Sequence, residues 1–471
     1  MIRLFCFIHL LLTCCVLCEA VDANKASRPN IVLFYVDDLG WSDLGYSGSS
    51  FYESPNVDRL ANEGVVFDNA YACAPNCAPS RACLMSGMYT PRHGVYTVGT
   101  SARGKSEDRM LIPVENKTIL EDDIHTLPEQ LKKLGYHTGH FGKWHLGDDP
   151  RNQGMDVNIA GKIWGSPSGG GYHSPFRFPN LEESETGFYL TDRISEKAVD
   201  FIEANKERPF FLYLAHYSVH TPIQPKPEYK SYFENRDPDR GHRNPGYAAM
   251  VRSMDESLGR VRDALRDLKL EDNTVVIFTS DNGGHGGVTS NRPLRGSKGM
   301  LYEGGIRVPF VAYWPGQFGG ARIESTPIIG VDLLPTILNL AGGKPDKKQV
   351  VDGESIIPLL KQKRHSLETR PIYWHFPAYL ERYRGLPEPG PFRTTPASAV
   401  RISRWKLLRF YESGREELYD LNIDLSEAND VSTKYPDIVK QLSNKLDAWL
   451  RETEAYLPTK QNPKYGGVNR D

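Results

Sequence analysis

The sequence predicts an α/β fold in which a large, doubly wound, mostly parallel sheet is flanked by helices and followed by a smaller C-terminal α+β subdomain. Three segments, 28–41, 208–222 and 273–287, each contain an apolar run with the continuous hydrophobicity of a strand buried on both faces. Segments typical of helices, at 126–135, 194–206 and 247–270, lie between them. Alternation of such strands and helices favours a parallel sheet covered by helices.

Polar residues follow each run at the point where its strand should end. Asp37 and Asp38 end the first run, His220 ends the second, and Asp281 and Asn282 end the third. Ligands in such sheets bind beyond the carboxyl ends of the strands. We therefore expect a functional site at this edge of the sheet.

The pattern changes near residue 370. The segments 371–376, 399–411 and 416–422 are typical of short antiparallel strands, and 435–456 is typical of a helix. We therefore predict an α/β domain over 21–370 and an antiparallel sheet with a helix over 371–471. The stretch 165–180 is rich in glycine, proline and serine, which predicts an irregular loop.

Residues 1–20 have the composition of a secretory signal peptide, with one arginine, an apolar run and small residues before a cleavage point after Ala20. The run is shorter than the roughly 20 apolar residues that a membrane-spanning helix needs. The alternatives are a buried strand, a membrane anchor, or a lipid anchor through Cys14 or Cys18. Export predicts a secreted or periplasmic protein, or a lysosomal or extracellular one in a eukaryote.

The composition limits the classes of partner. The chain has 471 residues, 39% hydrophobic and 25% charged, with a formal net charge of −2. This balance gives no general attraction to nucleic acid or to an anionic membrane, so local Lys, Arg and His must bind any anionic substrate. Removal of the signal would leave three of seven cysteines, Cys73, Cys77 and Cys83. In an oxidising compartment, an odd number indicates that one has a fate other than a disulfide.

The acids and the amide at the strand ends are candidate metal ligands. Asp37, Asp38, Asp281 and Asn282 supply hard oxygen donors, which suit Ca²⁺ or Mg²⁺. Adjacent carboxylates repel, so their ionised forms need a compensating cation. The alternative for each pair is that it caps the following helix. Two such strand ends on one edge favour the metal site.

A second group is cationic. Lys143 and His145 lie two residues apart in GKWHLG, on one side of the chain if it is extended, and His220 and Lys298 follow later. Each residue alone is typical of a solvated lysine or a structural histidine. Converging beside a metal, they would bind the oxygens of an oxyanion by charge-assisted hydrogen bonds.

Cys77 begins the stretch CAPSRACLMSG. Pro79 fixes a turn, and the residues after it predict a helix whose N-terminal amides favour an anion or lower the pKa of a thiol. Arg81, one turn on, can reach back to the same point. These residues leave a disulfide, a metal ligand, a buried thiol and covalent chemistry open for Cys77.

Taken in order along the chain, the motifs resemble those of the type I sulfatases, in the alkaline phosphatase superfamily. CAPSRACLMSG is similar to the C-x-P-S-R motif of that family, and GYHTGHFGKWHLG is similar to its second motif. The likeness begins at PNIVLFYVDDLGW and continues through PFFLYLAHYSVHTP, SDNGGHGG and LRGSKGMLYEGGIRVPF to EELYDLNIDLSEANDV. It covers nearly all of the chain after the signal.

The resemblance implies that Cys77 is oxidised during export to Cα-formylglycine (3-oxoalanine) by a formylglycine-generating or sulfatase-maturating enzyme. The aldehyde would hydrate to a gem-diol; one hydroxyl would attack sulfur and the other would expel sulfate. The resemblance also implies one Ca²⁺, with ligands from Asp37, Asp38, Cys77, Asp281 and Asn282. The remaining implied roles are Arg81 holding the gem-diol, Lys143 and Lys298 binding sulfate oxygens, His145 assisting elimination and His220 protonating the leaving alcohol.

The substrate that the resemblance implies is a sulfate ester, and we expect an exo-acting glycan sulfatase. His285, just past the metal pair, is a candidate substrate-binding residue beside Lys143, His220 and Lys298. The loops 100–125 and 165–180 are expected to line the pocket rim, the second with Tyr172, His173, Phe176 and Arg177. The alternatives are a phosphonate monoester or phosphodiester hydrolase of the same superfamily, and a glycan-binding protein that never modifies Cys77.

Two features depart from the family pattern. Asn76 precedes Cys77 where an apolar residue is common, and Cys73 and Cys83 lie on either side of the motif cysteine. Cys73 and Cys83 either pair as a disulfide or are both buried thiols, and we expect the second.

Overall fold

The computed structural model describes residues 28–363, 367–383 and 390–466. Its centre is an eight-stranded sheet with the order β11-β2-β10-β9-β1-β8-β4-β5. These strands are β11 (Arg322–Glu324), β2 (Val65–Phe67), β10 (Phe310–Tyr313), β9 (Thr274–Ser280), β1 (Asn30–Val36), β8 (Phe210–Ala215), β4 (His137–Gly142) and β5 (Val157–Ile159). Only the two pairings of β10 in this sheet are antiparallel, which confirms the predicted mostly parallel sheet.

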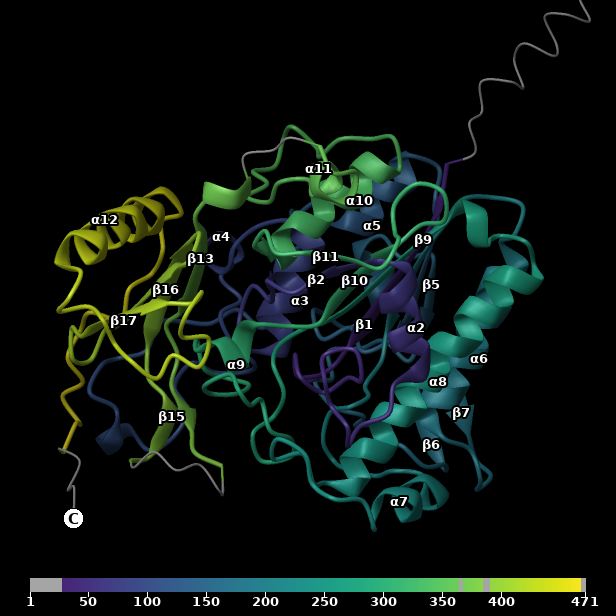
Figure 1. Ribbon diagram of the computed structural model, residues 1–471, viewed down its shortest axis with the longest axis horizontal. Coiled ribbons are helices and arrows are strands. Elements are labelled where there is room, and N and C mark those ends of the chain that lie inside the picture. Colours follow the sequence, from purple (N-terminus) through teal and green to yellow (C-terminus); the bar gives the residue numbers. More distant parts are fainter. Residues whose placement is uncertain (1–27, 364–366, 384–389, 467–471) are drawn as a thin grey trace, which may run out of the picture.

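The three apolar runs form the middle of the sheet as β9, β1 and β8. Every residue of β1 is buried, and alternate side chains enter opposite cores: Ile31 and Leu33 on one face, Val32 and Phe34 on the other. One face is covered by α3 (Cys77–Ser86), α5 (Leu127–Lys133) and α10 (Leu333–Leu340), and the other by α2 (Pro55–Glu63), α6 (Leu190–Ala204) and α8 (Pro245–Asp267) (Figure 1). Burial on both faces explains why these strands lack polar alternation.

The C-terminal part is an antiparallel sheet in the order β13-β16-β17-β18, covered by α12 (Pro436–Glu452). Its strands are β13 (Ile372–Phe376), β16 (Ala397–Ile402), β17 (Trp405–Phe410) and β18 (Glu416–Asp420), and a small hairpin pairs β14 (Leu380–Glu381) with β15 (Phe392–Thr394). The core of this sheet includes Tyr71, Cys73 and Cys83 from the larger domain. The two parts are therefore packed against each other through one apolar core.

The segment 165–180 is less irregular than expected. β6 (Phe176–Phe178) pairs with β7 (Leu181–Glu183) as an antiparallel hairpin. Phe176 and Phe178 are buried, and this apolar spacing on either side of Arg177 holds the strand against the core. Only the part of the segment before Phe176 is therefore irregular, as its glycine and proline content predicts.

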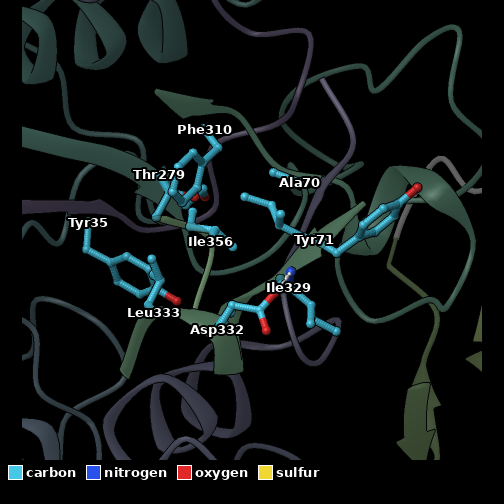
Figure 2. Close-up of a pocket in the computed structure, with 13 residues that line it drawn as sticks. Tyr35, Ala70, Tyr71, Thr279, Phe310, Ile329, Asp332, Leu333 and Ile356 are labelled. Atoms are coloured by element: carbon cyan, nitrogen blue, oxygen red, sulfur yellow. Dashed lines mark hydrogen bonds between the residues drawn. The ribbon is translucent and has the colours of Figure 1, made fainter. Parts of the chain in front are cut away.

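A cavity of about 10 Å³ lies inside the larger domain, lined by Tyr35, Thr279, Phe310, Asp332 and neighbouring residues (Figure 2). This volume suits about one water molecule and no substrate. The predicted signal peptide, 1–20, lies outside the described residues. Among the helices of the described ranges, none has the length and apolarity to cross a membrane.

Candidate active site

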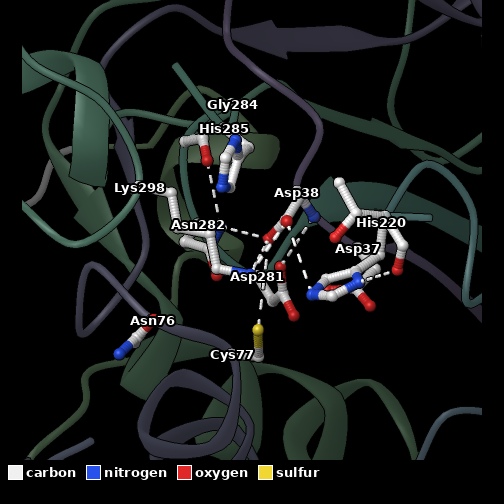
Figure 3. Close-up of polar contacts among 12 residues, drawn as sticks. Asp37, Asp38, Asn76, Cys77, His220, Asp281, Asn282, Gly284, His285 and Lys298 are labelled. Carbon is white, nitrogen blue, oxygen red and sulfur yellow. Dashed lines mark hydrogen bonds and ion pairs between the residues drawn. The ribbon is translucent and has the colours of Figure 1, made fainter. Parts of the chain in front are cut away.

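The carboxyl ends of β1, β8, β9 and β4 bring the predicted polar residues to one edge of the sheet. Val36 pairs with Ser280, so the residues that follow these two strands, Asp37 and Asp281, emerge side by side. The next strands on the other side, β8 and β4, lead to His220 and to Lys143. Figure 3 shows Asp37, Asp38, Asp281 and Asn282 converging above Cys77.

Cys77 is the first residue of α3 and is 2% exposed. Its Sγ lies 4.0 Å from Asp38 Oδ1. Burial opposes ionisation of this thiol, but Lys143 and Lys298 outweigh that effect and lower its pKa to about 6. The preceding Asn76 is also buried, and its Nδ2 donates to Thr97 Oγ1 at 2.9 Å, which anchors the turn before the helix.

Each buried cation of the site is hydrogen-bonded to one carboxyl group, and Arg81 Nη2 also lies 3.9 Å from Asp37 Oδ1. Lys143 Nζ lies 2.7 Å from Asp37 Oδ2, and Lys298 Nζ lies 2.7 Å from Asp38 Oδ1. Arg81 Nε and Nη2 donate to Asp281 Oδ2 at 2.9 and 2.8 Å, and Nη1 donates to the Lys143 carbonyl at 2.8 Å. Three carboxyl groups are thus paired with three cations, and burial raises the pKa of Asp37 well above its usual value in spite of Lys143. A divalent metal ion added to this set would make the site positive toward an anionic substrate.

Two of the predicted metal ligands, Asp37 and Asp38, lie with Cys77 in a group that could hold a metal ion, whereas Asp281 is outside this group. Single ligand atoms of Asp37, Asp38, Cys77 and His220 all lie within 4.8 Å of one another. Asp37 Oδ1 and Asn282 Oδ1 are buried without a hydrogen-bond partner in the described part of the chain. Because buried oxygens are normally satisfied, two orphaned acceptors beside three carboxylates are what a metal ion would occupy.

The two histidines differ in environment. Burial, with Lys143 and Arg81, lowers the pKa of His145 well below its usual value, so the ring is neutral. His145 has a left-handed φ of 67°, so GKWHLG turns here instead of running extended. Burial and Lys298 oppose protonation of His220, but Asp37 and Asp38 outweigh them and raise its pKa. His220 Nδ1 lies 2.6 Å from the Thr221 carbonyl, so Nε2 faces Asp38 at 3.7 Å.

His285 lies on the loop after Asn282, beside Lys298 (Figure 3). Burial is the main cause that lowers its pKa to about 4. The His285 ring stacks on Tyr383, with centroids 4.6 Å apart. Sequence reasoning did not find Tyr383, because this residue comes from the C-terminal subdomain, about a hundred positions along the chain. No sequence motif around Tyr383 indicates that this residue belongs to the site.

Two of the four residues of 165–180 that we expected at the pocket rim lie in the core instead. Tyr172 and Phe176 are 0% and 4% exposed and belong to the core. Tyr172 Oη donates to the carbonyls of Tyr217 and His220 at 2.6 and 2.9 Å, so it supports the His220 loop instead of lining an open pocket. Arg177 is exposed and paired with Glu182, and His173 contacts the Pro225 carbonyl.

Cys73 and Cys83 are buried free thiols, as expected, and no disulfide joins them in the described residues. Cys83 Sγ lies 3.3 Å from His93 Nε2. Burial raises the pKa of Cys83 well above its usual value. Both residues belong to the apolar cluster shared with the C-terminal sheet, so they contribute packing rather than chemistry.

Comparisons with known proteins agree with this geometry. Residues 29–343 match the sulfatase family model, and residues 297–452 match the C-terminal model of N-sulphoglucosamine sulphohydrolase. A protein from Formosa agariphila named sulfatase is 33% identical, with 92% of this chain and 90% of that protein covered. N-acetylgalactosamine-6-sulfatase of Homo sapiens is 36% identical, with 74% of this chain and 68% of that protein covered.

A solved structure is similar over the whole molecule. The crystal structure of Ps i-CgsB in complex with k-i-k-neocarrahexaose has a TM-score of 0.76 and 30% identity, with 94% of this chain and 96% of that chain covered. The fold, the charged cluster at the sheet edge and the family match over most of the length lead to one conclusion. The chain belongs to the sulfatase family, in the alkaline phosphatase superfamily, and is a sulfuric ester hydrolase.

Proposed function

We propose that this sulfatase hydrolyses sulfate esters of a carbohydrate, as an exo-acting glycan sulfatase, with one Ca²⁺ and a formylglycine made from Cys77. The observation that carries the proposal is the arrangement around Cys77, the buried first residue of α3. Two buried oxygens without hydrogen-bond donors, Asp37 Oδ1 and Asn282 Oδ1, lie near it together with Lys143 and Lys298. Such a set stabilises an anionic group at the reacting atom.

The metal ligands would be Asp37, Asp38, Asp281, Asn282 and the modified residue 77. These are oxygen donors, which favour Ca²⁺ over a soft metal. When bound, Ca²⁺ neutralises charge on sulfate and acidifies a hydroxyl bound to it. Formylglycine, as a hydrated aldehyde, supplies one hydroxyl for attack on sulfur and a second hydroxyl for release of sulfate.

The chain's own side chains would hold the substrate and move protons. Lys143 and Lys298 would bind sulfate oxygens, and Arg81 would orient residue 77. His220 would give the proton from Nε2 to the leaving alcohol, because its Nδ1 is engaged by the Thr221 carbonyl. His145 would accept the proton from the second hydroxyl.

The carbohydrate assignment is supported by the chemistry of the rim and by the relatives. The His285 ring stacks on Tyr383, whose hydroxyl contacts Ser297, so an aromatic pair of the kind that packs against sugars lies next to the loop of Lys298. Named relatives include N-acetylgalactosamine-6-sulfatase, and a similar structure contains a neocarrahexaose. We further propose export through residues 1–20, in keeping with conversion of Cys77 during secretion.

The test is turnover of a panel of sulfated saccharides and phosphonate monoesters by protein whose Cys77 has been converted, with Cys77→Ala as the control. We expect sulfate release from at least one sulfated sugar, and none from the variant. Cleavage of phosphonate esters without desulfation would assign the chain to the alternative hydrolase class. Saccharide binding without turnover of either ester would indicate a binding protein.

A further inference from the structure

Two arginines lie at the rim of the active site on the side of the C-terminal subdomain. Arg393 is on β15, and Arg103 is on the loop that precedes Arg109. Among the described residues, neither arginine has a carboxylate oxygen within ion-pair distance, although Glu381 lies on the adjoining strand β14. Glu381 binds Arg393 through its backbone carbonyl, which accepts from Nη1 at 2.6 Å.

Arg393 packs against the loop that carries Lys298. A Cβ placed on Gly299, the residue after Lys298, would be 2.7 Å from Arg393 Nε and 3.1 Å from Nη2. Its guanidinium lies over the Tyr383 ring, 5.0 Å from the centroid. Nε is buried and has no acceptor within the described part of the chain. A buried donor without an acceptor is costly, so an incoming anionic oxygen would be stabilised there.

Arg103 is held in place by its neighbours. Arg109 Nη1 donates to the carbonyls of Ala102, Arg103 and Gly104 at 3.0, 3.1 and 2.6 Å, which fixes the loop. Ala102 also forms an isolated bridge with Tyr379, just before the β14–β15 hairpin. Arg103 Nη2 donates to the Val98 carbonyl at 3.1 Å, and no carboxylate of the described residues forms an ion pair with this side chain.

The two arginines lie on neighbouring segments, because a Cβ placed on Gly104, next to Arg103, would be 2.5 Å from the ring of Phe392, next to Arg393. Their guanidinium groups repel each other. Burial lowers the pKa of Arg393, the charge of Arg103 lowers it further, and Tyr383, Glu381 and Asp38 oppose the decrease. Burial, and then Lys298 and Arg393 against the opposing Asp38, lower the pKa of His285. His285 lies beside Lys298, its ring stacks on Tyr383, and Arg393 lies over the Tyr383 ring, so the two rings connect Lys298 to Arg393 (Figure 3).

We propose that Arg393 and Arg103 form a second anion subsite, which binds a carboxylate or a second sulfate on the same saccharide as the scissile ester. This inference rests on the proposed glycan function and narrows its class of substrate. The preferred substrate carries at least two anionic groups, with the sugar between them facing the His285–Tyr383 pair. A carboxylate or sulfate oxygen would accept hydrogen bonds from Arg393 Nε and from Arg103.

The test compares substrates with one and with two anionic groups. The variants are Arg393→Gln, Arg103→Gln and Arg393→Lys, with Arg451→Gln on the exposed face of α12 as the charge-matched control. The substrates are 4-nitrophenyl sulfate, 6-sulfated N-acetylgalactosamine, the same sugar linked to a uronic acid, and a disulfated neocarra-oligosaccharide. Comparison of the last two separates a carboxylate from a second sulfate.

We expect Arg393→Gln and Arg103→Gln to lower kcat/KM about tenfold on a doubly anionic saccharide, mainly through KM. We expect 4-nitrophenyl sulfate turnover to change by less than about twofold, and Arg393→Lys to retain part of the lost affinity. Equal losses on all substrates, or no loss on either doubly anionic saccharide, would overturn the second subsite while leaving the glycan sulfatase proposal intact.

Calorimetry of the same two doubly anionic saccharides gives a readout that does not need turnover. We expect weaker binding in Arg393→Gln than in the wild type and in Arg451→Gln. If the wild-type protein desulfates nothing, the proposed function fails; an unchanged affinity in Arg393→Gln would separately refute the subsite.

Discussion

At the scale of single residues, the site consists of buried charges that are already paired before substrate arrives. Arg81 and Lys143 outweigh burial and hold the pKa of Asp281 below its usual value. Removing one member of such a pair leaves an uncompensated buried charge, at a cost of about 3–5 kcal/mol. The same pairing fixes the cations where a sulfate would lie, so little reorganisation is needed during reaction.

Gly165 gives His145 the space for its ring. A Cβ on Gly165 would lie 2.6 Å from His145 Cε1 and 2.7 Å from Nε2, so Gly165→Ala must displace the ring. Because the role proposed for His145 depends on the position of its ring, we predict a decrease in kcat of about tenfold to a hundredfold. Stability should change by less than about 1 kcal/mol, since the ring is the free end of a side chain.

Gly147→Ala is the matched control for that substitution. A Cβ there has its nearest neighbours at 4.0 Å, in the same segment after His145. Steady-state kinetics and thermal unfolding of both variants make the comparison. A Gly165→Ala enzyme with wild-type kcat would show that the position of His145 does not limit turnover.

The residues of the charged cluster at the sheet edge could be predicted from the sequence, but those at its rim could not. Asp37, Asp38, Asp281 and Asn282 follow apolar runs that had to be neighbouring parallel strands, so their convergence was predictable from strand order. Tyr383 and Arg393 reach the site through the packing of a second subdomain, which no local pattern reports. Tyr172 was misjudged because a tyrosine in a glycine-rich segment can serve the core as well as a pocket.

At the scale of the elements, the site depends on the close approach of β4 and β8. Gly142 ends β4 with φ 108°, and a Cβ there would lie 2.0 Å from the Ala215 carbonyl oxygen of β8. Lys143 donates from its backbone nitrogen to that same carbonyl at 2.6 Å. The position of Lys143 is therefore determined by a backbone contact that only glycine permits.

We predict that Gly142→Ala lowers the free energy of unfolding by more than about 3 kcal/mol, because backbone strain and a backbone clash combine. Gly342→Ala separates the two effects. Gly342 has φ 78° with nothing within 4 Å of a new Cβ, so its cost should be about 1 kcal/mol. Urea unfolding measures both, and equal costs would show that the contact with β8 is not tight.

At the scale of the whole molecule, a buried ion cluster joins the C-terminal sheet to the catalytic domain. Lys406 Nζ of β17 lies 2.9 Å from Glu303 Oε1 and 2.9 Å from Glu427 Oε1, and all three side chains are fully buried. Burial, and then the charge of Glu303 against the opposing Lys406, raises the pKa of Glu427 from 4.5 to about 7. The folded protein therefore keeps a proton on Glu427 that the unfolded chain releases.

Because the folded state binds this proton more tightly, Glu427 contributes stability below about pH 4.5 that is lost as the pH rises to about 7. We predict that Glu427→Gln, which cannot ionise, makes the free energy of unfolding less dependent on pH in this range. Urea unfolding at about pH 5 and about pH 7 measures the slope, with the exposed Glu368→Gln as the control. A variant with the wild-type slope would contradict the protonated state of Glu427.

The conversion of Cys77 is tested most directly by mass spectrometry of the tryptic peptide 60–81, from protein exported by a host that has a formylglycine-generating enzyme. This peptide contains both Cys73 and Cys77, so Cys73 is an internal standard for alkylation. We predict a peptide with one alkylated thiol, at Cys73, and a lighter aldehyde residue at position 77 that reacts with hydroxylamine. A peptide with two alkylated cysteines, from a preparation that still desulfates sugars, would contradict the formylglycine mechanism.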